Sequence, residues 1–284
     1  MSRDEAFQLR VQALQQVAQL NQQVLRLYQQ GQYPQGLPVA RQAVDLARQH
    51  LGEEQPETAN SLYNLGGLLL AMGDLTAARP YCEQALAIRR GVLGEDHPNT
   101  ASSLINLGAL LQDMGDLAAA RPYLEHALEV SRRTLGDNHP DTACSLNNLG
   151  CLLRAIGDLA AARPYVEQAL EINRRLLGED HPTTSTCLNN LGCLLIDIGD
   201  LSAARPYLEQ TLEIRRRALG NYHPDTAESV DKLGDLLQRM GDLAAALPFR
   251  EQSLEISRRE RGGDHPDTVT SLADLVVCHR SNLG

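Results

Sequence analysis

Apolar side chains recur at spacings of three and four residues through most of the chain, which is the period of an amphipathic helix. In residues 98–136, one apolar stripe covers 104–114 and a second covers 117–135. Between them, Gly115 can adopt the left-handed conformation that ends a helix, and Asp116 can cap the next one. The pattern therefore predicts a helical hairpin, whose first helix we name A and whose second helix we name B.

The same hairpin returns along the chain with a period of 42 residues. Matching prolines mark the start of the A helices and matching glycines mark their ends: Pro56, Pro98, Pro140, Pro182, Pro224 and Pro266, with Gly73, Gly115, Gly157, Gly199 and Gly241. One hairpin cannot bury its apolar face, but stacked hairpins share a continuous core. We therefore expect one array. It has a degenerate first repeat at 1–52, five repeats at 53–262, and at 263–284 a terminal helix that is either a cap or the start of a truncated repeat.

A glycine also recurs inside helix A, where it costs about 1 kcal/mol relative to alanine. Gly108 is an example, and an alanine recurs at the matching height of helix B, as at Ala120. Two small residues let neighbouring helices approach each other closely. We therefore expect each of these glycines to contact the alanine of its own hairpin.

The loop between repeats, LGEDHP at residues 93–98, sets Asp96 beside His97, as in a hydrolytic or metal site. Neighbouring residues at a helix start do not face each other, and no nucleophile recurs within reach of the histidine. In the second repeat the histidine is replaced by Gln55. We interpret the motif as a helix start, with Asp96 as the cap and Pro98 in the first turn.

All five full repeats carry G-D-L, as at 115–117; four carry N-L-G, as at 106–108, and three carry A-L, as at 127–128. With these motifs the chain resembles the tetratricopeptide-repeat family over nearly its whole length. Its 42-residue period and LGEDHPNTA-type linker are similar to the kinesin light chain and nephrocystin-like branch. The resemblance implies an all-α, right-handed superhelical solenoid of antiparallel helix pairs. It also implies that the A helices line a concave groove, which binds an extended peptide or a helix of another protein.

One surface of helix A differs from repeat to repeat, whereas the core positions are nearly fixed. The variable positions lie four, seven, eleven, fourteen and fifteen residues after the proline, and the first four of these spacings form one helical stripe. An irregular ligand requires such variation, and neutral drift at exposed positions is the alternative. The candidate binding residues at these positions are Tyr63, Ile105, Asn147, Asn189, Asp231, Arg154, Asp235 and Arg239.

A nearly constant position runs along the edge of this stripe, eight residues after the proline. It is occupied by Asn64, Asn106, Asn148, Asn190 and Lys232. An amide both donates to and accepts from a peptide backbone, so a ladder of amides can hold an extended chain of any sequence. The resemblance implies this role for the asparagines. The alternative is that they are hydrogen-bonded within the array itself.

The chemistry of the expected groove changes along the chain. Tyr63, Leu70 and Ile105 make its N-terminal part apolar. Its C-terminal end concentrates charged residues: Glu228, Asp231, Asp235 and Asp274, beside Lys232, Arg239 and Arg280. Because complementary charge mainly sets specificity and association rate, we expect a protein or peptide ligand with an apolar anchor and a basic end.

Composition narrows the classes of function. A net charge of -10 argues against a nucleic-acid partner, which requires a basic face. No stretch has the length and apolarity of a membrane helix, and the first residues lack the apolar core of a signal peptide, so we expect a cytoplasmic protein with no membrane partner. The six cysteines form no C-x-x-C pair or zinc spacing and are expected to be free thiols.

Cys144, Cys151 and Cys193 come nearest to a soft-metal or thiol site, but the sequence places no histidine or other base beside them. We therefore predict no metal and no cofactor. The predicted function is a non-catalytic protein–protein interaction scaffold, not an enzyme. The alternative is a sensor or regulatory region of a larger multidomain signalling protein, whose effector domain lies outside this chain. Nothing in the pattern predicts the oligomeric state.

Overall fold

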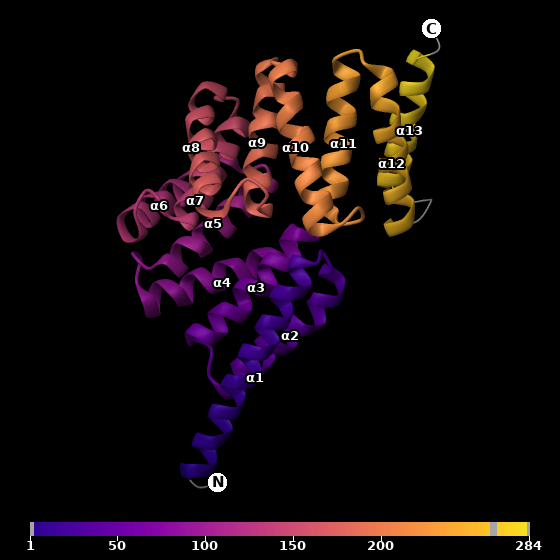
Figure 1. Ribbon diagram of the computed structural model, residues 1–284. Coiled ribbons are helices and arrows are strands. Elements are labelled where there is room, and N and C mark those ends of the chain that lie inside the picture. Colours follow the sequence, from indigo (N-terminus) through magenta and orange to yellow (C-terminus); the bar gives the residue numbers. More distant parts are fainter. Residues whose placement is uncertain (1–2, 262–265, 283–284) are drawn as a thin grey trace. The chain divides into compact units, whose positions relative to one another are not determined.

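A computed structural model of the chain describes residues 3–261 and 266–282. Within these residues it contains thirteen α-helices and no β-strand (Figure 1). The helices are α1 (Arg3–Gln29), α2 (Tyr33–His50), α3 (Pro56–Ala71), α4 (Leu75–Leu93), α5 (Pro98–Asp113), α6 (Leu117–Leu135), α7 (Pro140–Ile156), α8 (Leu159–Leu177), α9 (Pro182–Ile198), α10 (Leu201–Leu219), α11 (Pro224–Arg239), α12 (Leu243–Arg261) and α13 (Pro266–Asn282). Odd-numbered helices are A helices and even-numbered ones are B helices, so the predicted all-α array of helix pairs is confirmed.

The chain divides into two compact units, Met1–Gly157 and Asp158–Gly284, which we call the N-terminal and C-terminal units. In the N-terminal unit each helix packs on the next from α1 to α7, and the A helices α1, α3, α5 and α7 also contact one another in a row. In the C-terminal unit each helix from α8 to α13 packs on the next in the same way. Each unit is therefore a two-layer stack, and its core lies between the layers of A and B helices.

The predicted repeat boundaries fall between helices. Helices α1 and α2 lie within 1–52, α3 to α12 within 53–262, and α13 within 263–284. Residues 262–265, which include one boundary, lie outside the described residues. The assignment of the first repeat as degenerate and of the last helix as a cap stays a prediction.

The turn from helix A to helix B follows the predicted pattern. Gly157 ends α7 with φ 91°, and its backbone N–H donates to the carbonyls of Leu153 and Arg154. The aspartate after the glycine then caps helix B, as Asp116 Oδ1 does by accepting from the Ala119 N–H at 3.1 Å. A left-handed glycine followed by an aspartate cap therefore makes this turn in the five full repeats. In the first repeat Gly31 is followed by Gln32, whose side chain makes no cap.

The turn from helix B to the next helix A differs from the prediction, because the cap is the histidine and not the aspartate. His97 Nδ1 accepts from the Asn99 N–H at 3.1 Å, and the histidines before α7, α9 and α11 do the same. The imidazole Nδ1 is as many bonds from Cα as an aspartate oxygen, so it reaches the same backbone N–H. Asp96 instead forms an ion pair with Arg133 of the next B helix.

The glycines inside helix A do permit close packing, but the nearest contact is a longer side chain of helix B and not the predicted alanine. At Gly192 the carbonyl oxygen of Ala204 also lies within contact distance, 3.6 Å from an added Cβ. A Cβ placed on Gly108 would lie 2.6 Å from Cγ and Cδ2 of Leu124, four residues beyond Ala120. On Gly66 it would lie 2.8 Å from the Sγ of Cys82. The glycine therefore makes room for a buried side chain of helix B one turn further along.

A polar pair joins each B helix from α4 onward to the next A helix. The partners are fourteen residues apart: Arg89 with Ser103, Ser131 with Ser145, Asn173 with Cys187, Arg215 with Ser229, and Ser257 with Ser271. Most of these residues are fully buried, so each must satisfy the hydrogen-bonding groups of the other. The sequence comparison missed this interface because its residue types change from repeat to repeat.

Candidate partner-binding surface

The candidate residues lie on the A helices, and we describe them separately in the two units. In the N-terminal unit they come from α3, α5 and α7, which lie side by side. In the C-terminal unit they come from α9 and α11. We call these two sets the N-terminal and C-terminal A-helix surfaces.

The asparagine ladder of the N-terminal unit is partly bonded within the array. Asn64 donates from Nδ2 to Asn21 Oδ1 at 3.1 Å, and Asn148 donates to the backbone carbonyl of Cys144 at 2.8 Å. The Asn106 side chain, between them, makes no hydrogen bond within the described part of the chain and lies next to Gly67, where an added Cβ would be 3.8 Å from Asn106 Nδ2. Of these three amides, Asn106 is therefore the one that offers its full hydrogen-bonding capacity to a ligand.

Tyr63 is half-buried because an arginine beneath it occupies one face of its ring. The Arg89 guanidinium lies 4.4 Å from the ring centroid and donates to Asn60 Oδ1 at 2.9 Å. Burial raises the pKa of Tyr63 to about 12, and the nearby Cys144 thiol adds to the rise while Arg89 opposes it. The Tyr63 hydroxyl is therefore a hydrogen-bond donor at neutral pH.

The other candidates of the N-terminal unit differ in accessibility. Ile105 on α5 and Arg154 in the last turn of α7 are half-buried, so each still reaches the surface. Asn147 is only 9% exposed and lies mainly in the core of α7. The predicted stripe is therefore a real surface at Tyr63, Ile105 and Arg154, and turns inward at Asn147.

Two amides on α9 of the C-terminal unit differ in the same way, since one reaches the surface and the other is buried. Asn190, the ladder residue, is half-buried. Asn189 is only 3% exposed, and its Oδ1 accepts no hydrogen bond within the described residues. A buried acceptor without a partner is costly, and because Asn189 is almost wholly covered, the predicted stripe turns inward here as it does at Asn147.

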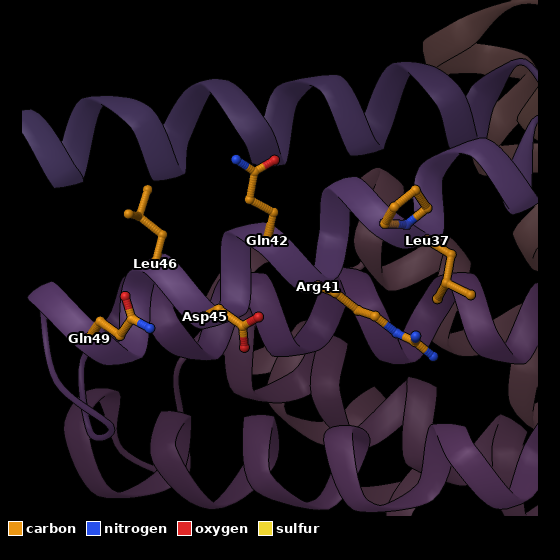
Figure 2. A pocket seen from close by; sticks show the side chains of 7 residues that line it. Leu37, Arg41, Gln42, Asp45, Leu46 and Gln49 are labelled. Atoms are coloured by element: carbon orange, nitrogen blue, oxygen red, sulfur yellow. The ribbon is translucent and has the colours of Figure 1, made fainter.

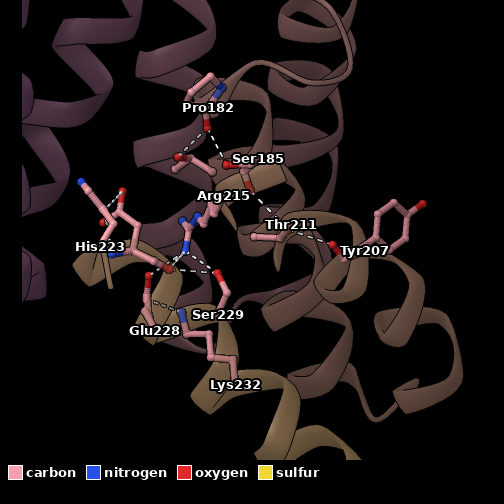
Figure 3. A network of polar contacts seen from close by, with 11 residues as sticks. Pro182, Ser185, Tyr207, Thr211, Arg215, His223, Glu228, Ser229 and Lys232 are labelled. Carbon is pink, nitrogen blue, oxygen red and sulfur yellow. Dashed lines mark hydrogen bonds and ion pairs between the residues drawn. The ribbon is translucent and has the colours of Figure 1, made fainter. Parts of the chain in front are cut away.

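The ladder position of α11 is part of an ionic network, which Figure 3 shows from close by. Lys232 Nζ lies 2.6 Å from Glu228 Oε1, and the buried Arg215 lies 3.2 Å from Glu228 Oε2. Arg215 also donates to Ser229 Oγ at 2.8 Å. Burial alone would raise the pKa of Glu228, but Lys232 and Arg215 together lower it. Burial alone would lower the pKa of Lys232, but Glu228 raises it.

The remaining acidic candidates on α11 are also paired. Arg250, with a side chain only 5% exposed, reaches from α12 to Asp231 at 3.0 Å and to Asp235 at 3.5 Å. Arg239 bonds Asp235 at 2.8 Å. Three carboxylates of this surface thus face four cations, and the surface is not the unbalanced acidic end that the sequence suggested. The side chains of Asp274 and Arg280 lie outside the described residues.

Three buried arginines were missed by the sequence comparison. Arg89 and Arg215 take a helix B position that holds Ser131 and Asn173 in other repeats, and Arg250 takes the position of Leu124. A long charged residue at a position that is otherwise small or apolar was the available signal. Each of the three guanidinium groups ends beside a variable residue of helix A.

One pocket of the N-terminal unit lies along α2 and is lined by residues outside the N-terminal A-helix surface. Figure 2 shows its lining residues: Leu37, Pro38, Arg41, Gln42, Asp45, Leu46 and Gln49. Gln42 corresponds by the 42-residue period to Gln84 and Gln252, and each of those accepts a hydrogen bond from an arginine of the preceding B helix, at 2.7 and 2.5 Å. In these two later repeats, the residue at the position of Gln42 thus makes a contact between repeats.

The remaining chemical features belong to residues 3–261 and 266–282, the part of the chain that the structure describes. No three histidine, cysteine, aspartate or glutamate side chains converge there as metal ligands would. Within the same residues, no helix combines the length and apolarity needed to cross a membrane. Cys144, Cys151 and Cys193 form no disulfide within the described residues. Loss of hydration and the nearby Asp141 carboxylate raise the pKa of the Cys144 thiol to about 11, which disfavours the reactive thiolate.

Helix pairs repeated at this period and stacked in two layers define a helical repeat protein, a class of proteins that bind partners on extended surfaces. A family model described as tetratricopeptide repeat matches residues 17–79, 57–129, 101–175, 155–217, 199–247 and 225–282. The chain therefore belongs to the tetratricopeptide-repeat family. A comparison with curated proteins gives no match.

Solved structures share this fold. A kinesin light chain-type protein of nearly identical TPR-like repeats from Podosopora anserina is 25% identical, with a TM-score of 0.55, over 72% of this chain and 96% of that one. BtubC (BKLC) from P. vanneervenii is 24% identical, with a TM-score of 0.59, over 84% and 93%. A Rap protein complexed with competence and sporulation factor is 14% identical, with a TM-score of 0.66, over 93% and 75%. The predicted kinship with kinesin light chain-like repeats is confirmed.

Proposed function

We propose that this protein is a non-catalytic interaction scaffold whose A-helix surfaces bind a peptide or helix of a partner protein. The observation that carries the proposal is the N-terminal A-helix surface. There the Asn106 amide is unbonded beside the exposed parts of Tyr63 and Ile105, on helices whose other residues repeat almost unchanged. An unbonded amide next to apolar side chains suits a peptide, which presents both backbone amides and side chains.

The structural likeness to a Rap protein agrees with this proposal. That protein is complexed with competence and sporulation factor, but at 14% identity the likeness extends only to the fold. We therefore base the proposal on the A-helix surfaces of this chain. The alternative function, a regulatory region of a larger signalling protein, uses the same surfaces and differs only in what the binding event controls.

The chemistry of the ligand follows from the two surfaces. An apolar anchor fits Tyr63 and Ile105 on the N-terminal surface. A basic end would have to compete with Lys232, Arg239 and Arg250 for the carboxylates of α11. We therefore expect affinity to depend only weakly on salt, because little net charge is neutralised on binding. The proposal includes a cytoplasmic location and needs no cofactor.

The test is a pull-down that compares the wild-type chain with the triple variant Asn106→Ala, Asn148→Ala, Asn190→Ala. The control carries Asn99→Ala and Asn221→Ala, which lie at exposed positions outside both surfaces. Circular dichroism checks that all three proteins have the same helix content. We expect partners that the wild type and the control retain and the triple variant loses. Identical partners for all three proteins would refute the role of the asparagines.

A further inference from the structure

Arg89, on α4 of the N-terminal unit, is a buried cation that has no carboxylate partner within the described residues. It is only 5% exposed. Its guanidinium donates to the Asn99 carbonyl and Ser103 Oγ at 2.8 Å and to Asn60 Oδ1 at 2.9 Å, all of which are neutral acceptors. The Arg89 Nε finds no acceptor in the same part of the chain. A buried charge without an opposite charge beside it is costly, so Arg89 is a place where an anion would be stabilising.

Arg215, on α10 of the C-terminal unit, takes the same position three repeats later and does have a carboxylate partner. Its side chain is 4% exposed and lies beside Glu228 in Figure 3, 3.2 Å from the Oε2 of that residue. Its hydrogen bonds to the Asp225 carbonyl and to Ser229 Oγ repeat two of the bonds of Arg89. The two guanidinium groups are therefore held alike, and they differ in whether the next A helix provides an acid.

The acid stands four residues after the proline of helix A, and it occurs only where an arginine precedes it. In the repeats whose preceding B helix has no arginine at the position of Arg89, this residue is uncharged: Asn60, Cys144, Thr186 and Thr270. After Arg215 the residue is Glu228. After Arg89 it is Ser102, which is uncharged and much shorter. The N-terminal unit thus keeps the arginine and lacks the acid that pairs with it in the C-terminal unit.

The path from solvent to an arginine in this position is open. The Glu228 side chain is 47% exposed, although it contacts the almost fully buried Arg215. An acid from outside the chain can therefore reach such a guanidinium by the path that Glu228 follows. In the N-terminal unit this path begins at Ser102, which is half-buried and too short to fill it.

Groups suited to a peptide flank this space on two neighbouring helices. Tyr63 lies on α3, and the Arg89 guanidinium is 4.4 Å from the centroid of its ring. Ile105 and Asn106 lie on α5, in the turn that follows Ser102. A peptide that uses both helices continues on either side of the acid, so the acid is an internal side chain and not the end of a chain.

We propose that the space beside Arg89 and Ser102 is a carboxylate subsite, occupied by an aspartate or glutamate side chain of the bound peptide. The ligand carboxylate accepts a charge-assisted hydrogen bond from Arg89, as Glu228 does from Arg215. Because Arg89 is buried, salt screens this pair only weakly. The C-terminal surface has its own acid at this position and does not select an acidic ligand there. The subsite rests on the proposed function, since it names the charge that the bound peptide carries.

Thermal unfolding tests the subsite without a ligand, through Ser102→Glu and Ser102→Gln. The two introduced side chains have nearly the same size and differ in charge. A carboxylate at this position should pair with Arg89, so Ser102→Glu should melt a few degrees above Ser102→Gln at neutral pH. Thr186→Glu and Thr186→Gln are the matched controls and should melt alike, because Asn173 stands there in place of the arginine. Equal differences at both positions, or none at Ser102, would overturn the proposal.

Selection from a random peptide library displayed on phage tests the ligand. The peptides are fused through their C-termini, so the library offers acids as side chains alone. Sequences enriched by the wild type should carry aspartate or glutamate at one position beside an apolar residue. Ser102→Glu should reduce that enrichment about tenfold or more, because its own carboxylate occupies Arg89. The control Thr183→Glu adds the same charge at an exposed position of the C-terminal unit and should keep the enrichment.

The outcomes of the selection separate the subsite from the function on which it rests. An apolar consensus without an acid, or an acid that Ser102→Glu enriches as strongly as the wild type, would overturn the carboxylate subsite and leave the binding surface in place. If the wild type enriches no sequence, the proposed function fails, and the subsite fails with it.

Discussion

Two glycines in helices of the N-terminal unit lie in opposite surroundings, and substitution of each by alanine separates packing from helix propensity. Gly108 lies inside α5, where an added Cβ would be 2.6 Å from Leu124. Gly91 lies in the last turns of α4, where an added Cβ would meet no atom within 4 Å. The backbone at both positions is helical, so replacement of either glycine by alanine increases the helix propensity of the chain there.

The expected magnitudes follow from these distances. Gly91→Ala should stabilise the protein by about 0.5–1 kcal/mol, because alanine is the better helix former. Gly108→Ala gains the same stabilisation from helix propensity. Its added methyl group, however, presses against Leu124 in a filled core, which costs about 1–3 kcal/mol. Leu124 is only 1% exposed, so it has no open space into which to rotate. The two variants should therefore differ by about 1–3 kcal/mol in their free energy of unfolding.

Urea unfolding followed by circular dichroism measures both variants against the wild type. The comparison is valid if the slope of unfolding free energy against urea is unchanged. Leu124→Ala provides the internal control, because it removes the atoms that the new Cβ would meet. In that background, Gly108→Ala should become stabilising. If Gly108→Ala stabilises the otherwise wild-type protein as much as Gly91→Ala does, close packing is not the reason for the glycine.

Three further predictions concern caps and charges. His139→Ala should destabilise the fold by about 0.5–2 kcal/mol through loss of the helix cap, whereas His139→Asn should restore most of that stability in thermal unfolding. The pKa of Glu228 is lowered in the fold, since Lys232 and Arg215 outweigh burial. The ionised Glu228 therefore stabilises the fold above about pH 4.3, the pKa of a glutamate in the unfolded chain. This stabilisation is lost as the pH falls through the lower pKa that Glu228 has in the folded protein. Glu228→Gln should therefore make the stability of the protein less sensitive to pH in the acid range. Arg250→Leu, which restores the residue type of other repeats, should change the free energy of unfolding by less than about 1.5 kcal/mol. It should also make binding of a basic peptide to the C-terminal surface stronger and more salt-dependent in calorimetry.

The fold could be predicted well from the sequence because it depends on the combined pattern of many residues. Every repeat contributes many apolar residues at the helical period, and no single residue decides the outcome. The aspartate caps of the B helices and the glycine turns were predicted for the same reason, since they recur in identical form. The family assignment rests on these recurring elements.

The errors concern individual contacts. The cap of helix A was assigned to Asp96 because aspartate is the commoner cap, yet the imidazole of His97 reaches the same N–H and leaves Asp96 to pair with Arg133. The partner of Gly108 was placed at Ala120 because small residues were expected to face each other, but a glycine can equally admit a large side chain. Periodicity places a residue on a face of a helix. It does not say how far a long side chain reaches.

That limit matters most at the binding surface, where the chemistry depends on residues that belong to the other layer of helices. The variable residues of α11 read as an acidic patch when the A helix is considered alone. The structure adds Arg215 from α10 and Arg250 from α12, which reach through the core to the same carboxylates. In the N-terminal unit Arg89 does the same beneath Tyr63 and Asn60. A helix B arginine therefore sets the charge presented by a neighbouring helix A. Substitution of such an arginine would alter ligand preference without changing any residue that a ligand touches.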